Sequence, residues 1–87
     1  MQHNVVIAGY VRTPFHFAGK GDLAGVRPDD LAALAVRALV KQTGVNTREI
    51  EDLILGCAFP EGEQGFNVAR IIANIAELPL SVAGVTV

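Results

Sequence analysis

The order in which apolar runs and helical patterns follow one another constrains this fold more than any other feature of the sequence. Three short apolar runs, at residues 5–9, 53–58 and 82–87, are separated by two stretches with helical spacing. Continuous apolar runs of this length are typical of strands that are covered on both faces, as in parallel sheets. The alternation therefore predicts an α/β fold, built as a β-α-β-α-β unit with a parallel sheet and right-handed crossovers.

The first helix is predicted to begin at residues 28–30 and to end before Gly44. Proline suits the first turn of a helix, and Asp29 and Asp30 complement the positive end of the helix dipole. Gly44 is suited to the C-terminal cap. The buried face is expected to consist of apolar residues at helical spacing: Leu31, Leu34, Ala35, Ala38 and Leu39.

The second helix is predicted to follow a glycine-containing loop, with Asn67 as its N-cap and Pro79 beyond its end. A single helical turn is expected before the second strand, from Thr47 to Ile50. The buried face of the second helix is expected to contain four apolar residues: Val68, Ile71, Ile72 and Ile75.

The composition is more apolar than a free-standing domain of this size needs. Hydrophobic residues make up 51% of the 87 residues and charged residues 18%, against roughly 45–50% and about 25% in typical domains. A small domain has a large surface to keep polar, so the excess predicts another layer or subunit over part of it. The last apolar run stops at Val87 inside the predicted third strand. We therefore expect an incomplete, opening part of a larger α/β protein, with sheet edges that invite pairing.

Charge and hydropathy patterning argue against several classes of function. The net charge is −2, and lysines and arginines are scattered singly, which argues against binding to nucleic acid or to an anionic membrane surface. No apolar run approaches the roughly 20 residues of a membrane span, and the first residues lack a signal-peptide pattern. The single cysteine, Cys57, allows no intrachain disulfide and fits a reducing compartment. The expected location is the cytoplasm.

Few residues suggest chemistry on their own, and each has a simpler explanation. Cys57 could be a nucleophile, but no basic residue is adjacent to it in the sequence, so a buried structural cysteine is the simpler interpretation. His16 lies between two phenylalanines, where packing or a loop hydrogen bond explains it. Glu61 and Glu63 could be paired carboxylates, although solvated loop residues are the simpler interpretation. The glycines of loop 62–65 are only a weak signal for a phosphate cradle.

Several short motifs also occur in a characteristic order. They are Arg12-Thr13-Pro14-Phe15, Lys20-Gly21, Asp30-Leu31, Asp52-Leu53-Ile54-Leu55-Gly56, Glu63-Gln64-Gly65-Phe66-Asn67-Val68-Ala69-Arg70 and Gly84-Val85-Thr86-Val87. Taken together, they resemble the N-terminal segment of a thiolase, and the resemblance covers essentially all 87 residues. The stretch 64–70 most resembles the bacterial 3-ketoacyl-CoA thiolases of fatty-acid β-oxidation, with acetyl-CoA acetyltransferases as the close alternative.

The resemblance implies a layered αβαβα fold, of which residues 1–87 would form the first part of the N-terminal domain. It implies thiolytic cleavage of a 3-ketoacyl-CoA to acetyl-CoA and a shortened acyl-CoA, or the reverse condensation. Such enzymes use a nucleophilic cysteine, a histidine base, a second cysteine and oxyanion holes. Acyl-CoA and CoA would be substrates, no cofactor would be needed, and the enzyme would be a homodimer or homotetramer.

None of those catalytic residues is expected within this chain. In the family the stretch matching Thr86-Val87 runs on into Asn-Arg-x-Cys, whose cysteine is the nucleophile, so the 87-residue chain alone is predicted to be inactive. No catalytic, cofactor-binding or metal-binding residue is therefore assigned. The resemblance places Val85, Thr86 and Val87 at the dimer interface. It assigns scaffold or loop positioning to three other residues: Arg12, Asn67 and Arg70.

Two other interpretations remain open at this point. The chain could be a free-standing interaction or binding module of thiolase-like ancestry without catalysis. A weaker possibility is a nucleotide-binding half-domain unrelated to thiolases, in which Arg70 could contact a phosphate. The residues encoded after Val87 distinguish the enzyme from the module, because an Asn-Arg-x-Cys continuation favours the enzyme and a stop codon favours the module or a decayed remnant. A defined complex with a nucleotide, without a thiolase continuation, would favour the half-domain.

Overall fold

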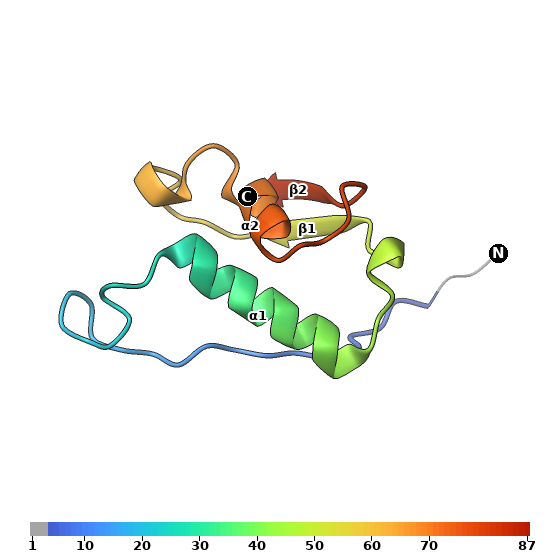
Figure 1. Cartoon of the computed structure of the whole chain (residues 1–87), viewed down its shortest axis with the longest axis horizontal. Helices are drawn as coiled ribbons and strands as arrows, with labels where there is room; N and C mark the ends of the chain where they lie inside the picture. The colour runs from blue at the N-terminus through green and yellow to red at the C-terminus, as the bar shows by residue number, and fades with distance from the viewer. Residues whose placement is uncertain (1–3) are drawn as a thin grey trace.

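The computed structural model describes residues 4–87 and contains two helices beside a two-stranded parallel sheet (Figure 1). The α/β class predicted from the sequence is therefore confirmed. The order of elements along the chain is α1 (Pro28–Thr43), the one-turn helix η1 (Thr47–Glu49), β1 (Asp52–Leu55), the one-turn helix η2 (Gly62–Gln64), α2 (Val68–Ile75) and β2 (Ala83–Thr86).

Helix α1 begins and ends where its sequence predicts. Pro28 occupies the first turn with Asp29 and Asp30, and Gly44 follows the last turn in the left-handed conformation with φ 68°. The Gly44 amide donates to the carbonyl of Val40 over 3.0 Å, which satisfies one of the free carbonyls at the helix end. These signals are local in sequence, so the bounds follow from the chain itself.

The buried side of α1 is not the side predicted. Ala33 is fully buried against α2, and Val36 and Val40 pack beside it, whereas Leu34 on the expected face is 60% exposed. At 100° per residue, the expected and observed stripes lie on opposite sides of the helix. The helix is apolar on both sides, with a narrow polar stripe that includes Arg37, so periodicity alone does not show which side is covered. Small alanines at 32 and 33 suit the closer approach to α2.

Strands β1 and β2 pair in parallel, with Asp52 opposite Ala83 and Leu55 opposite Thr86. The ladder extends one step further, because the Cys57 amide donates to the carbonyl of Val87 over 2.8 Å. One face of the sheet packs on the core, but the other does not: Ile54 is 67% exposed. Within residues 4–87 the sheet is therefore covered on one face rather than on both.

The predicted first strand, Val5–Gly9, is wrong for this structure. The segment has no strand pairing, and Val5, Val6 and Ile7 are 97%, 77% and 92% exposed. A strand exists only through a partner, and the described part of the chain places none beside it. Only its end lies beside the C-terminal half of α1: Ala8 and Gly9 line a hollow with Val40 and Thr43, and a Cβ on Gly9 would lie 2.8 Å from Thr43 Cγ2 (Figure 1).

The core is small and centres on α2. Val68 and Ile72 are buried as predicted, while Ile71 and Ile75 are only half-buried. Arg37 of α1 donates to the carbonyl of Ile75 and so ties the two helices together. The buried cluster consists of Ala33, Val68, Ile72, Ala73, Ala76, Leu78 and Val82.

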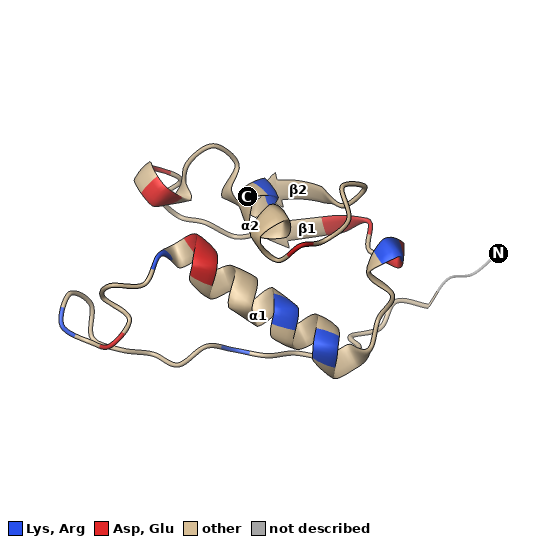
Figure 2. Ribbon diagram, in the orientation of Figure 1, with Lys and Arg blue, Asp and Glu red and all other residues tan. Residues whose placement is uncertain are grey.

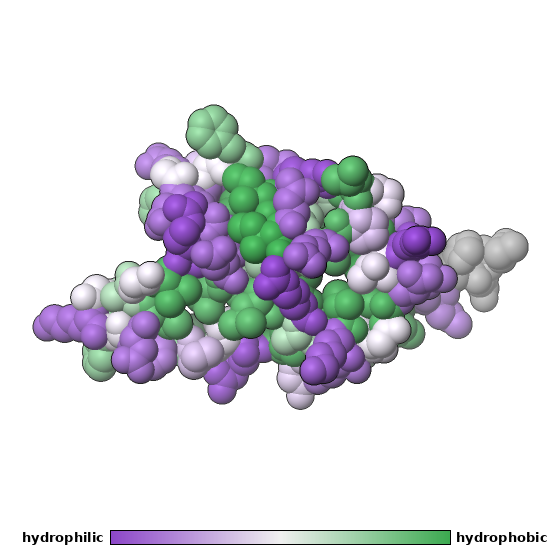
Figure 3. Space-filling view, in the orientation of Figure 1, coloured by the Kyte–Doolittle hydropathy of each residue, from purple (hydrophilic) through white to green (hydrophobic). Residues whose placement is uncertain are grey.

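The surface combines scattered charges with many exposed apolar side chains. Lysines and arginines lie at separate places along the chain (Figure 2). Apolar residues reach the surface in several places on the face seen in Figure 3. Large exposed side chains include Phe15, Phe17, Phe66 and Leu80, each at least 85% exposed. Neither helix of residues 4–87 is long and apolar enough to span a bilayer.

Candidate functional site

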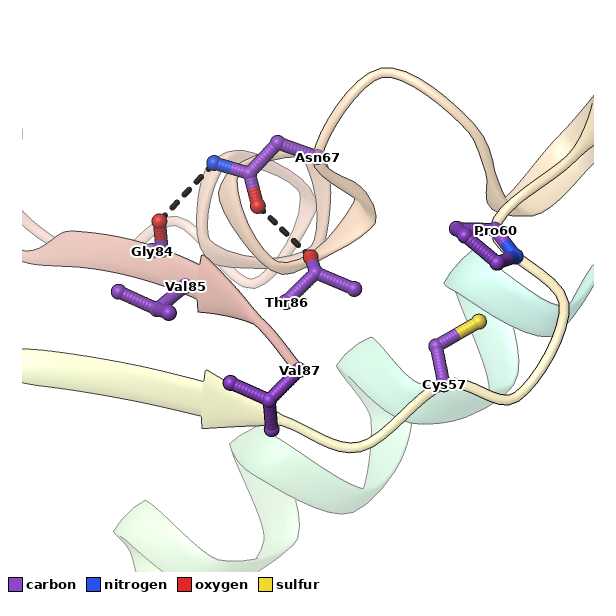
Figure 4. A pocket seen from close by; sticks show the side chains of 7 residues that line it. All are labelled: Cys57, Pro60, Asn67, Gly84, Val85, Thr86 and Val87. Carbon is purple, nitrogen blue, oxygen red and sulfur yellow. Dashed lines mark hydrogen bonds between the residues drawn. The ribbon is translucent and has the colours of Figure 1, made fainter.

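The most connected polar cluster lies where α2 begins beside the C-terminal end of β2 (Figure 4). Asn67 Nδ2 donates to the carbonyl of Gly84 over 2.9 Å, and Asn67 Oδ1 accepts from Thr86 Oγ1 over 2.7 Å. Thr86 Oγ1 in turn accepts from the amide of Ala69 over 3.1 Å. Three linked hydrogen bonds therefore join the first turn of α2 to the last residues of β2.

Thr86 performs the capping role that the sequence predicts for Asn67. Asn67 does stand at the N-cap position, but its backbone is left-handed, with φ 53° and ψ 71°, and its side chain caps no amide of the helix. Asparagine tolerates this conformation better than most residues. The hydroxyl that accepts from the first turn comes instead from a strand far along the chain. Local sequence patterns do not reveal such a cap, because they consider only the residues next to the helix.

Arg70 holds the same strand from one helical turn further on. Its Nη1 donates to the carbonyl of Val82 over 2.6 Å. Gly84 lies directly under this turn, where a Cβ would come within 2.6 Å of the Arg70 amide nitrogen and 2.8 Å of its Cα. The start of α2 therefore rests on the backbone of β2 at a position that has no room for a side chain.

These bonds also occupy part of the open edge of β2. The amides of Ala83 and Val87 donate to β1, to the carbonyls of Glu51 and Leu55. Because backbone groups of successive strand residues point to opposite edges, those of residues 82, 84 and 86 face away from β1. The outward carbonyls of residues 82 and 84 accept from Arg70 and Asn67, respectively. A further strand pairing at this edge would therefore meet carbonyls that already accept hydrogen bonds.

An open pocket of about 450 Å³ lies at this end of the sheet, lined by Cys57, Pro60, Asn67, Gly84, Val85, Thr86 and Val87. The carboxyl ends of parallel strands are where α/β proteins usually bind ligands. Cys57 is half-buried and forms no disulfide. None of the other six lining residues has an ionisable side chain, so the pocket offers Cys57 no base of its own.

A charged cluster that the sequence does not predict lies at the start of α1. Arg27 donates from Nε and Nη2 to both oxygens of Asp29, over 3.1 and 3.0 Å, and its Nη1 lies 3.0 Å from Glu63 Oε2. Asp29 is buried and also accepts from the amide of Asp30. The Arg27 hydrogen bond holds the pKa of Asp29 below its usual value, although burial opposes this, and the same bond raises the pKa of Arg27. Glu63 is exposed, as expected of a solvated loop residue, but its ion pair with Arg27 also links η2 to the start of α1.

Two of the remaining candidates, Arg12 and His16, do not line this pocket, whereas Val85 and Val87 do. Arg12 is exposed, and its side chain donates to the carbonyl of the adjacent Thr13 over 3.4 Å. His16 lies in the loop before α1, with its Nδ1 4.0 Å from Asp22 Oδ2. Of the residues expected at a dimer interface, Val85 and Val87 are 43% and 69% exposed. Their role and that of Arg12 remain predictions.

Comparison with known proteins connects this chain to one family. Residues 5–87 match the sequence model of the thiolase N-terminal domain. The 3-ketoacyl-CoA thiolase of Bacillus subtilis (strain 168) is 49% identical over 87 residues, covering 100% of this chain and 22% of that protein. The 3-ketoacyl-CoA thiolase of Yersinia pestis (strain Pestoides F) is 45% identical over 85 residues, covering 97% of this chain and 22% of that protein.

A relative with a different name is similar to the same degree. The β-ketoadipyl-CoA thiolase of Pseudomonas aeruginosa is 46% identical over 87 residues, which cover 99% of this chain. The chain spans 21% of that protein's length, close to the 22% found for the other two.

Proposed function

Because this chain belongs to the thiolase family, we propose that it is the N-terminal part of an acyltransferase that cleaves a 3-ketoacyl-CoA by thiolysis. The products would be acetyl-CoA and an acyl-CoA shortened by two carbons, and the reverse condensation would use the same site. The observation that carries the proposal is the match to the N-terminal domain over residues 5–87. Acyl-CoA and CoA serve as substrates, no cofactor is required, and the protein acts in the cytoplasm.

The chemistry proceeds in two acyl transfers. A cysteine thiolate attacks the 3-keto carbon, and the bond between C2 and C3 breaks with its electron pair on C2. The second cysteine gives C2 a proton, and acetyl-CoA leaves. The thiol of CoA then takes the acyl group and releases the cysteine. We place this cysteine outside residues 1–87, because Cys57 is the only cysteine here and its pocket supplies no base.

The substrate is proposed to be a 3-ketoacyl-CoA of fatty-acid β-oxidation, as the names of the Bacillus and Yersinia relatives suggest. A second candidate is β-ketoadipyl-CoA, whose acyl chain ends in a carboxylate. The observation that supports this candidate is the 46% identity to the Pseudomonas β-ketoadipyl-CoA thiolase. It lies between the 49% and 45% identities to the two 3-ketoacyl-CoA thiolases. Both candidates undergo the same bond changes and differ only at the far end of the acyl chain.

The protein is also proposed to be a homodimer or homotetramer, with Val85, Thr86 and Val87 at a subunit interface. The exposure of Val85 and Val87 supports this. Because the outward carbonyls of Val82 and Gly84 are already bonded, contact there would depend on side chains and on the strand end.

The proposed activity is tested by comparing the full-length protein with the 87-residue chain. CoA-dependent loss of a medium-chain 3-ketoacyl-CoA and of β-ketoadipyl-CoA is followed by the disappearance of the 3-keto absorbance. The full-length protein should cleave one of them, the 87-residue chain neither, and a Cys57→Ser variant of the full-length protein should retain activity. Turnover by the short chain, or loss of activity in Cys57→Ser, would contradict the placement of the nucleophile, and an inactive full-length protein would favour a non-catalytic module.

A further inference from the structure

The bonds at the end of β2 meet at one hydroxyl group. Thr86 Oγ1 donates to Asn67 Oδ1 and accepts from the amide of Ala69, so the hydroxyl acts both as a donor and as an acceptor. The side-chain amide of Asn67 also acts as both, since its Oδ1 accepts from Thr86 and its Nδ2 donates to the carbonyl of Gly84. Figure 4 shows these groups pointing toward one another between the start of α2 and the strand.

The arrangement fixes β2 in more than one direction. The ladder to β1 sets the register of the strand within the sheet. The Asn67 and Arg70 side chains hold its outward edge at Gly84 and Val82, and contact between α2 and Gly84 fixes the height of the strand against the helix. The hydrogen bond from the Thr86 hydroxyl to Asn67 holds the end of the strand, one residue before Val87.

Asn67 also adopts an unusual backbone conformation. It holds φ 53°, as one of three non-glycine residues with positive φ within residues 4–87. A non-glycine residue in this region costs stability, and the conformation persists only where its surroundings determine it. Here the left-handed backbone accompanies a side chain that bonds to two strand residues rather than to the helix that follows it.

We infer that Asn67 and Thr86 are positioning residues that set where the chain leaves β2, and hence where the nucleophilic cysteine lies. The inference rests on the proposed function and on the thiolase resemblance, which implies that the nucleophilic cysteine follows shortly after Val87. Neither residue needs to touch the substrate for this role. They act because a reacting atom misplaced by about 1 Å can cost on the order of 100-fold in rate.

The experiment uses the full-length protein with matched substitutions. Thr86→Val keeps the shape but removes the hydroxyl, and Thr86→Ser restores it. Asn67→Asp keeps the acceptor for Thr86 and tolerates the left-handed backbone, but its carboxylate no longer donates to Gly84. For each variant we would measure kcat and KM for thiolysis and the thermal midpoint. We would also measure the pH dependence of alkylation of the cysteine after β2 by iodoacetamide, identified by mass spectrometry.

Thr86→Val and Asn67→Asp should each lower kcat by about tenfold or more while KM changes by less than about twofold. The pH profile of alkylation should shift in the same variants. Thr86→Ser should recover kcat to within about twofold of the wild type, because it restores both hydrogen bonds.

A purely structural role would produce a different result. If Thr86→Val or Asn67→Asp lowered only the thermal midpoint, and left kcat and the alkylation profile unchanged, the inference would be overturned. The same holds if no cysteine follows β2. The alkylation comparison does not require turnover, so an inactive wild-type protein would refute the proposed function while alkylation still decides the positioning role.

Discussion

Gly84 shows how closely α2 approaches the sheet. The nearest atoms to an added Cβ would be backbone atoms of Arg70 and Ala69, at 2.6 to 3.0 Å, which cannot turn aside as a side chain can. Gly84→Ala should therefore destabilise the full-length protein by about 1–3 kcal/mol, the usual cost of overpacking. Urea unfolding measures this change.

The matched control for that substitution is Gly56→Ala at the end of β1. A Cβ there meets no atom within 4 Å, and the residue is exposed. Its free energy of unfolding should change by less than about 0.5 kcal/mol. An equal loss in the two variants would show that close packing against α2 is not the reason.

The ion pair of Asp29 should make the free energy of unfolding fall when the pH becomes acidic. Its folded pKa is depressed by the hydrogen bond from Arg27, so its contribution is present above the unfolded pKa of about 3.9. The contribution is lost as the pH falls through the lower, folded value. Arg27 stays charged throughout this range, because its pKa is raised from an already high value.

Asp29→Asn should accordingly destabilise the full-length protein at pH 7. The difference in thermal midpoint from the wild type should narrow as the pH falls below about 4. Asp30→Asn removes the same charge from the same helical turn at an exposed position and should cost less. A constant difference between Asp29→Asn and wild type across pH would argue against the ion pair as its source.

At the scale of the elements, the sequence predicts what depends on neighbouring residues. The bounds of α1 follow from Pro28 and Gly44, and the parallel pairing of β1 with β2 follows from the strand-helix-strand order. The sequence fails where an element depends on distant groups. Val5–Gly9 has a strand-like composition but no partner strand in the described residues.

In the candidate site, too, the sequence predicts local features and misses those that depend on distant residues. The sequence motifs single out Asn67 and Arg70, but they do not reveal that both side chains bond to β2. Thr86 is expected only at an interface, because its use as a helix cap depends on a contact across 17 residues. The Arg27–Glu63 pair depends on a loop folding back onto α1, which no spacing rule predicts.

The two apolar sides of α1 lead to a prediction about that helix. Ala33 is fully buried against α2, so Ala33→Leu should overpack the interface and cost about 1–3 kcal/mol. Ala38, on the opposite side, is exposed within residues 4–87, and Ala38→Leu should cost less in the 87-residue chain. Chemical denaturation of the two variants compares them, and the reverse order of losses would contradict the observed packing of α1.

At the scale of the whole molecule, the described chain is more extended than a compact domain. Its radius of gyration is 14.2 Å and its extents are 51 × 25 × 22 Å, whereas a compact domain of this length has a radius near about 12 Å. The extended N-terminal segment and the uncovered outer face of the sheet account for much of the exposed apolar surface. Surfaces of this kind favour association, either with the rest of a larger protein or with other copies.

The 87-residue chain alone should therefore self-associate, and the outer face of the sheet should contribute more than the edge of β2. On that face Ile54 lies opposite Val85, and both are exposed, whereas the outward carbonyls of Val82 and Gly84 are already bonded. Sedimentation velocity over a range of concentrations should show association that Val85→Lys weakens, because a charge there opposes burial of the face. Asp52→Lys places the same charge at an already polar position of that face and should have a smaller effect. A monomer that unfolds cooperatively at every concentration would show that this exposed surface does not drive association.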